Sequence, residues 1–230
     1  MPDLHAVATG DIVASSELPA AERRRLPDTL RGAYAEVRAL APNALPHELV
    51  LTGGDGWQCY VRNPVHALPR VLHFCAILQA SGLRSRCALA IDTVDFIDED
   101  DLGASDGPAF RRSGRALSRL SDDQRTACLL PDVLSPVYHL AAEGLCELVD
   151  HLMQNWTEAQ TRAVAGMLRS IGTDLSVTQS DIAEQWEPEP VTRQTVNRHL
   201  HRAHWPRLER TLSRFERLTC HIPDALPSSP

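Results

Sequence analysis

The spacing of apolar and polar positions divides the chain near residue 132. Before this point, short β-prone apolar runs alternate with segments whose apolar residues recur every three or four positions. After it, every periodic segment has the helical repeat. Strict alternation is typical of half-buried strands, and the longer repeat is typical of amphipathic helices. The pattern therefore predicts a mixed α and β part followed by an all-helical part.

The first part predicts the element order βαββαβ, followed by one more helix and one more strand. This order implies an antiparallel sheet with helices on one face, which is an α+β architecture. The expected elements are a strand at 4–15, a helix at 19–41, a hairpin at 48–62, a helix at 65–79, a strand at 86–92, a helix at 108–120 and a strand at 126–130.

The second part begins after Pro131 and Pro136. Its amphipathic segments predict helices at 137–153, 157–170, 178–186, 192–203 and 206–218. The last ten residues contain three prolines and are expected to fray. The predicted organisation is a first domain at 1–132, a helical domain at 133–220 and a flexible tail at 221–230.

Two aspartates stand where predicted strands end, each beside glycine. Asp11 follows the first strand, and Asp55 lies in the Gly53-Gly54-Asp55-Gly56 turn of the hairpin. If the hairpin pairs beside the first strand, the two carboxylates converge at one end of the sheet. Mg²⁺ prefers such oxygen ligands together with substrate phosphates. The alternative is turn chemistry alone, because Asp-Gly is also a common hairpin signal.

The amino-acid composition excludes several classes of mechanism and partner. All 23 basic residues are arginine, so lysine-dependent mechanisms such as a Walker phosphate loop or a Schiff base are excluded. A net charge of −7 argues against a protein that coats nucleic acid indiscriminately. Charge is uneven, however. Residues 95–101 are acidic and form either a solvated loop or a further cation site, whereas residues 192–217 hold seven arginines against two glutamates.

Several signals point to a cytoplasmic protein. The six cysteines are scattered without a Cys-x-x-Cys pair, which favours reduced thiols over a zinc site. No apolar run reaches the roughly 18 residues that a membrane helix needs. A strand is predicted almost at the N-terminus, where a secretory leader would have a basic segment and a long apolar run.

The helices within residues 178–204 follow a helix-turn-helix pattern. In the second of them, Val196 and Leu200 share an apolar face. Its other positions carry side chains that can contact base edges or phosphates, namely Arg193, Gln194, Asn197, Arg198 and His201. The pattern predicts binding to duplex DNA. The alternative is a helical bundle with a solvated arginine face.

Four segments together resemble the SatD family, which is similar to the class III nucleotidyl cyclases. They are Thr9-Gly10-Asp11-Ile12-Val13, Gly54-Asp55-Gly56, Ala90-Ile91-Asp92 and Ser105-Asp106-Gly107-Pro108-Ala109-Phe110, the last followed by Arg115-Ala116-Leu117. The resemblance extends over essentially the whole chain. It implies a ferredoxin-like or palm βαββαβ domain followed by a helix-turn-helix domain.

The resemblance also implies site residues. Asp11 and Asp55 match the metal-binding aspartates of the cyclases, with the backbone carbonyl of Ile12 beside the first. Arg111 and Arg115 fall where the cyclases keep an asparagine and an arginine that stabilise developing negative charge. Leu51 stands in place of the adenine-selecting lysine. The implied partners are a nucleoside triphosphate with Mg²⁺ or Mn²⁺, and a second copy of the chain in a homodimer.

Three functions follow from these features. The first is a regulator that binds a nucleotide and Mg²⁺ in the cyclase-like domain and DNA through the helix-turn-helix. The second is an active cyclase that uses two metal ions. The third is an interaction protein in which both aspartates are turn residues. The helix-turn-helix pattern favours the first.

Overall fold

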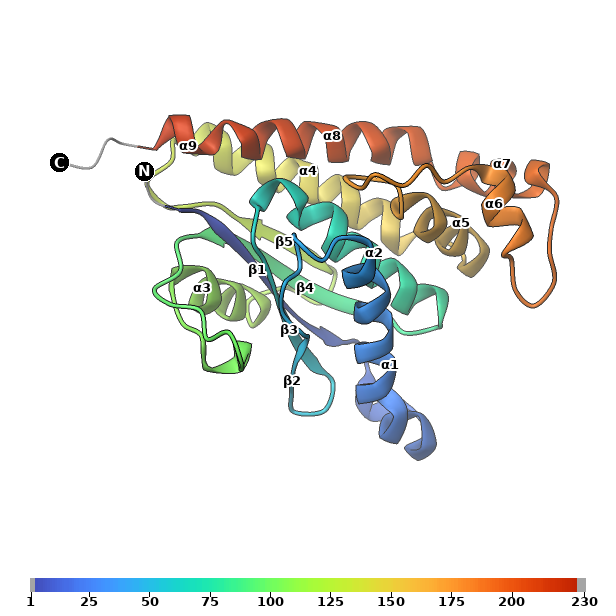
Figure 1. Cartoon of the computed structure of the whole chain (residues 1–230), viewed down its shortest axis with the longest axis horizontal. Coiled ribbons are helices and arrows are strands. Elements are labelled where there is room, and N and C mark those ends of the chain that lie inside the picture. Colours follow the sequence, from blue (N-terminus) through green and yellow to red (C-terminus); the bar gives the residue numbers. More distant parts are fainter. Residues whose placement is uncertain (1–2, 227–230) are drawn as a thin grey trace.

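A five-stranded sheet forms the centre of the molecule in a computed structural model that describes residues 3–226 (Figure 1). The strand order is β2-β3-β1-β4-β5. Neighbouring strands are antiparallel except β4 and β5, which run parallel. The strands are β1 (His5–Ile12), β2 (Val50–Thr52), β3 (Gly56–Val61), β4 (Ser85–Asp92) and β5 (Thr126–Leu129). The expectation of a wholly antiparallel sheet is wrong at β5, because a helical crossover returns the chain in the direction of β4.

The helices fall in the segments that the periodicity predicts. They are α1 (Ala20–Leu40), α2 (Ala67–Ala80), α3 (Pro108–Leu117), α4 (Pro136–Gln154), α5 (Glu158–Leu168), α6 (Gln179–Glu184), α7 (Arg193–Arg202), α8 (Trp205–Cys220) and α9 (Ile222–Ala225), with short 3₁₀ turns at Ser15–Glu17, Pro64–His66 and Leu102–Ala104. The expected order of elements and the α+β class are confirmed. The ferredoxin-like or palm assignment stays a prediction.

Helices cover both faces of the sheet, which corrects the expectation of helices on one face. Along β1, Ala6 and Ala8 belong to the core beneath α1 and α2. Val7 points the other way and packs with Ala109 and Phe110 of α3. Because successive side chains of a strand alternate between faces, β1 directs Ala6 and Ala8 toward one layer of helices and Val7 toward the other. Figure 1 shows α3 across the sheet from α2.

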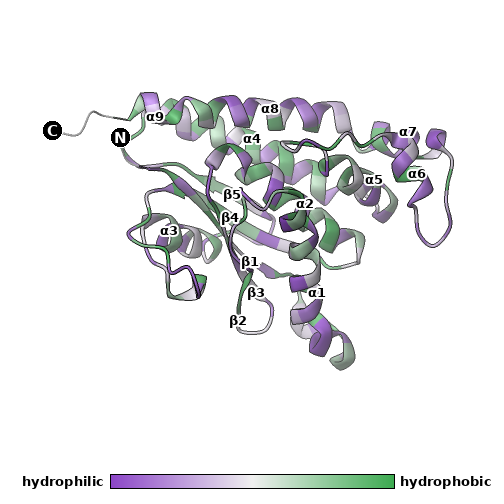
Figure 2. Cartoon of the chain, viewed as in Figure 1, coloured by the Kyte–Doolittle hydropathy of each residue, from purple (hydrophilic) through white to green (hydrophobic). Residues whose placement is uncertain are grey.

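The C-terminal helices continue the core of the sheet. Helix α5 packs on α2, α4 packs beside β5, and α8 runs along α4 (Figure 1). One apolar cluster extends from Leu4 to Ile222 and includes residues on both sides of position 132. Figure 2 shows apolar residues concentrated where these helices face the sheet and one another. The predicted domains at 1–132 and 133–220 therefore share a core.

The end of the described chain is helical. Residues 222–225 form α9, and the Ile222 side chain is fully buried. The structure therefore has a short helix within residues 221–226, where the sequence predicted a flexible tail. The rest of that predicted tail, residues 227–230, lies outside the described residues. Of the helices between residues 3 and 226, none combines the length and apolar character needed to cross a membrane.

Candidate functional sites

Asp11 and Asp55 lie at the same end of the sheet. Asp11 is the second-last residue of β1. Its neighbour Gly10 stands opposite Trp57 of β3, and Asp55 precedes Trp57 by two residues. The antiparallel register therefore brings the end of β1 beside the β2–β3 turn, as the sequence predicts.

Each of these carboxylates is already held by another side chain of the protein. Arg86 on β4, directly opposite Asp11, donates from Nε to Asp11 Oδ1 at 2.9 Å and from Nη2 to Oδ2 at 2.6 Å. This hydrogen-bonded pair raises the pKa of Arg86. Ser15 donates its hydroxyl to Asp55 Oδ2. The bidentate geometry engages both oxygens of Asp11 with one planar cation.

This donor set does not fit a divalent cation as it is folded. The Arg86 guanidinium already offsets the charge of Asp11 and would repel a divalent cation placed beside it. Within residues 3–226, no group of three or more His, Cys, Asp or Glu side chains could hold a metal. Ile12 is buried on the core side of β1. Binding of Mg²⁺ or Mn²⁺ here stays a prediction from the sequence.

Packing and turn geometry explain the glycines beside the aspartates. A Cβ at Gly10 would lie 2.3 Å from the Trp57 ring and 2.4 Å from the Arg86 carbonyl oxygen. Gly53 and Gly54 have φ values of 63° and 96°, which side chains other than glycine rarely adopt. The motif residues around Asp11 and Asp55 thus have structural reasons for their identity.

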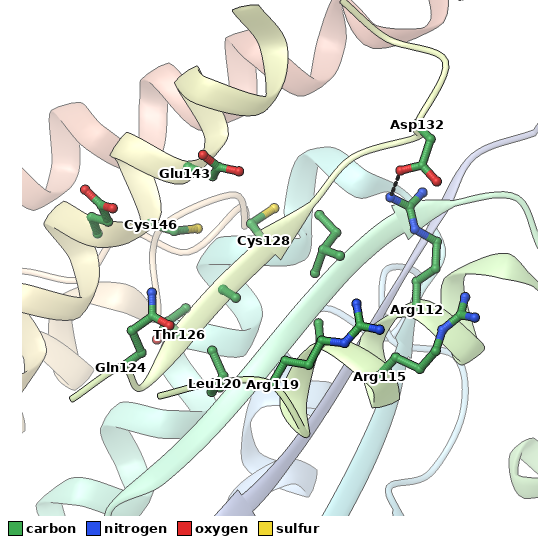
Figure 3. A pocket seen from close by; sticks show the side chains of 14 residues that line it. Arg112, Arg115, Arg119, Leu120, Gln124, Thr126, Cys128, Asp132, Glu143 and Cys146 are labelled. Carbon is green, nitrogen blue, oxygen red and sulfur yellow. Dashed lines mark hydrogen bonds and ion pairs between the residues drawn. The ribbon is translucent and has the colours of Figure 1, made fainter. Parts of the chain in front are cut away.

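The two arginines expected to stabilise developing negative charge lie in different surroundings on α3. Arg111 is exposed and pairs with Asp95 and Asp106, at 3.1 and 2.6 Å. Arg115 instead lines a cavity of about 540 Å³ between α3, β5 and α4 (Figure 3). Arg112 and Arg119, which the sequence analysis did not select, also line this cavity.

The acidic run at 95–101 is a loop that hydrogen-bonds to itself. Asp98 Oδ1 accepts the backbone N–H groups of Asp100 and Asp101, at 3.0 and 2.9 Å. Asp101 Oδ1 accepts that of Gly103 at 2.9 Å. Together with the Arg111 pair to Asp95, these contacts favour the loop interpretation over a cation site.

The polar residues predicted on α7 are all on the surface. Arg193, Gln194, Asn197, Arg198 and His201 are exposed, and so is Arg202, which the sequence analysis left out. Val196 and Leu200 on the opposite side are buried. We call the six exposed residues the α7 surface. Among residues 3–226, none of its three arginines forms an ion pair.

Neighbouring helices hold α7 in place. It packs against both α5 and α6, and these three helices lie together at one end of the molecule (Figure 1). Thr192 caps the helix by accepting the Thr195 N–H. His199 stacks on Trp186 with ring centroids 5.7 Å apart. Partial burial, followed by the charges of Arg198 and Arg202, lowers the pKa of His199, which favours the neutral ring.

A scan against models of known protein families finds none that matches this chain, and a search of curated proteins finds no relative.

Proposed function

We propose that the protein binds duplex DNA through the α7 surface and acts as a DNA-binding regulator. The observation that carries the proposal is the division of α7 into a buried apolar side and an exposed side of arginine, amide and imidazole groups. Arginine, asparagine and glutamine can make bidentate contacts with base edges in the major groove. Arginine also binds phosphates.

The arrangement of α6 and α7 suits a helix-turn-helix. The two helices pack on each other, and α5 packs against both of them. In this motif the N-terminal residues of the second helix contact base edges while the first helix crosses the backbone. Arg193, Gln194 and Asn197 occupy the first half of α7. Gln179 at the start of α6 donates to Asn197 Oδ1 at 3.4 Å, so the start of α6 lies close to the α7 surface.

Fluorescence polarisation of the full chain with a random-sequence duplex at several salt concentrations tests this proposal. The proposal is supported if the logarithm of the association constant falls linearly with the logarithm of the salt concentration. For the three α7 arginines we expect a slope of about −2 to −3. Absence of binding at low salt, or binding without a salt slope, contradicts it. The full chain is needed because the helices share a core with the sheet.

A second candidate function is binding of a nucleoside triphosphate at the Asp11–Asp55 end of the sheet. One observation favours it, namely that β1 and the β2–β3 turn bring both aspartates to the same end. The Arg86 pair counts against it. Calorimetry with ATP, GTP, CTP and UTP, with Mg²⁺ or Mn²⁺, measures binding, and mass spectrometry detects cyclic products. Signals that disappear in Asp11→Asn and Asp55→Asn would establish this function.

A further inference from the structure

The strand β5 leaves one edge of the sheet open. It pairs with β4 on one side, and within residues 3–226 no strand pairs with it on the other. In the parallel ladder, the Cys87 N–H donates to the Arg125 carbonyl at 2.7 Å, and Cys87 stands opposite Thr126. Backbone groups of a strand alternate in direction, so those of Ala127 face β4 while those of Thr126 and Cys128 face outward.

The outward edge of β5 faces the cavity between α3 and α4. Thr126, Ala127, Cys128 and Leu129 all line it. In the described part of the chain, no side chain forms a hydrogen bond with the backbone of Thr126 or Cys128. The next outward carbonyl, that of Leu130, is taken by Arg112 Nη2 at 2.7 Å. The edge is therefore open over Thr126–Cys128 and closed at Leu130.

The two walls of this cavity carry opposite charges. Arg115 and Arg119 project from α3 on one side of β5, and Glu143 and Glu147 belong to α4 on the other (Figure 3). All four side chains are exposed. Within residues 3–226 none of them has an ion-pair partner, whereas Arg112 at the closed end pairs with Asp92 and Asp132.

We propose that the outer edge of β5 binds an extended peptide segment of another protein, with acidic and basic side chains in alternation. An added strand would satisfy the outward backbone groups of Thr126 and Cys128. Its side chains would point alternately toward the α3 wall and the α4 wall. Acidic residues would then meet Arg115 and Arg119, and basic residues would meet Glu143 and Glu147.

A second copy of the chain suits this edge poorly. Two β5 edges joined by a twofold axis perpendicular to the sheet would place both α3 helices on the same face. Arg115 and Arg119 would then approach their own counterparts, and so would Glu143 and Glu147. Like charges brought together across an interface disfavour it. This argument selects a foreign segment over self-association at this edge.

Fluorescence polarisation with designed peptides tests the proposal on the intact protein. The probe is a labelled peptide of alternating aspartate and lysine, compared with a peptide of the same composition in two blocks. We expect the alternating peptide to bind at least about tenfold more tightly. A matched pair of probes is N-methylated either on all aspartate amides or on all lysine amides. Only one set of amides faces β5, so only one of these probes should lose binding.

Charge exchange on the protein tests the walls. The double substitution Arg115→Glu and Arg119→Glu makes both walls acidic. It should lower the affinity for the alternating peptide by about tenfold or more and raise the affinity for an all-lysine peptide. Arg23→Glu with Arg24→Glu makes the same change in net charge on the exposed side of α1 and should alter neither affinity. Circular dichroism and the unfolding temperature show whether each variant is folded.

Three results would overturn the proposal. Equal affinity for the alternating and block peptides would leave only nonspecific charge attraction. Equal effects of the two N-methylation patterns would show that the peptide does not add to β5 as a strand. A dimer detected by light scattering that Thr126→Pro dissociates would assign the edge to a second copy, since this change removes an outward N–H.

Discussion

At the end of the sheet, Asp11 is bound at both oxygens by Arg86, and Asp55 accepts a hydrogen bond from Ser15. On α7, Arg193 and Arg198 are exposed without an ion-pair partner in residues 3–226. Both places carry the kinds of side chain that bind ligands. The difference teaches that residue type and convergence do not suffice to identify a binding site. A charged group already paired within the protein has less charge and fewer lone pairs to offer a ligand than an unpaired one.

Gly10→Ala tests whether the glycine beside Asp11 is there for packing. The added Cβ would overlap the Trp57 ring and the Arg86 carbonyl. Because both neighbours are fixed in the sheet, we expect a loss of about 2–4 kcal/mol in the free energy of unfolding, measured by urea titration. Gly32→Ala on α1 is the control, since its Cβ meets nothing within 4 Å. Normal stability of Gly10→Ala would make packing the wrong explanation.

Arg193→Glu combined with Arg198→Glu tests the α7 surface, whose arginines have no ion-pair partner in residues 3–226. Two reversed charges on the α7 surface should reduce affinity for duplex DNA by about 100-fold, or about 2.7 kcal/mol, at low salt. The unfolding temperature should stay unchanged because both side chains are exposed. Arg23→Glu with Arg24→Glu carries the same change in net charge, and an equal loss of affinity there would reduce the effect to overall charge.

His73 is buried on α2, which packs against α5. Burial, with the charges of Arg70 and Arg169, lowers the pKa of His73 to about 3. The unfolded chain binds this proton near pH 6.5 and the folded chain does not, so stability falls as pH drops from about 6.5 toward 3. Between pH 7 and pH 5 this amounts to about 2 kcal/mol.

Urea unfolding at several pH values measures this contribution. The slope of stability against pH should flatten in His73→Leu and should persist in His201→Gln, whose side chain is exposed on α7. An unchanged slope in His73→Leu would assign the acid sensitivity to other groups.

A double-mutant cycle tests the ion pair between Asp11 and Arg86. Asp11→Asn, Arg86→Gln and their combination should give a coupling energy of about 1–2 kcal/mol in urea unfolding, without a change in DNA affinity. Zero coupling would show that the ion pair does not stabilise the fold.

Mg²⁺ can be added to the same samples. The ion pair predicts no effect on the unfolding temperature of any of them. A rise in the wild type that Asp11→Asn and Asp55→Asn both lose would instead support the metal site expected from the sequence.

Much of the fold follows from local patterns, and the remainder depends on long-range pairing. The apolar repeat predicts every helix from α1 to α8. Periodicity shows that α3 has an apolar side, but not which face of the sheet Phe110 will cover. The parallel pairing of β5 likewise depends on where α3 crosses.

The site shows the same division. The sequence correctly selects the exposed residues of α7, because Val196 and Leu200 define the opposite side. It misses Arg86, whose signal appears only once β1 and β4 are paired in register, with Asp11 and Arg86 facing each other. Opposite charges on directly facing strand positions are the pattern that could have revealed this pair.

The apolar cluster that runs from Leu4 to Ile222 also limits how this protein can be dissected. Cutting the chain before α4 would expose the apolar residues of α2 and β5 that the C-terminal helices cover, and both fragments would then have aggregation-prone surfaces. A deletion that abolishes an activity could then do so because the fragment misfolds. Single substitutions in the intact polypeptide are therefore the sound way to assign roles to its parts.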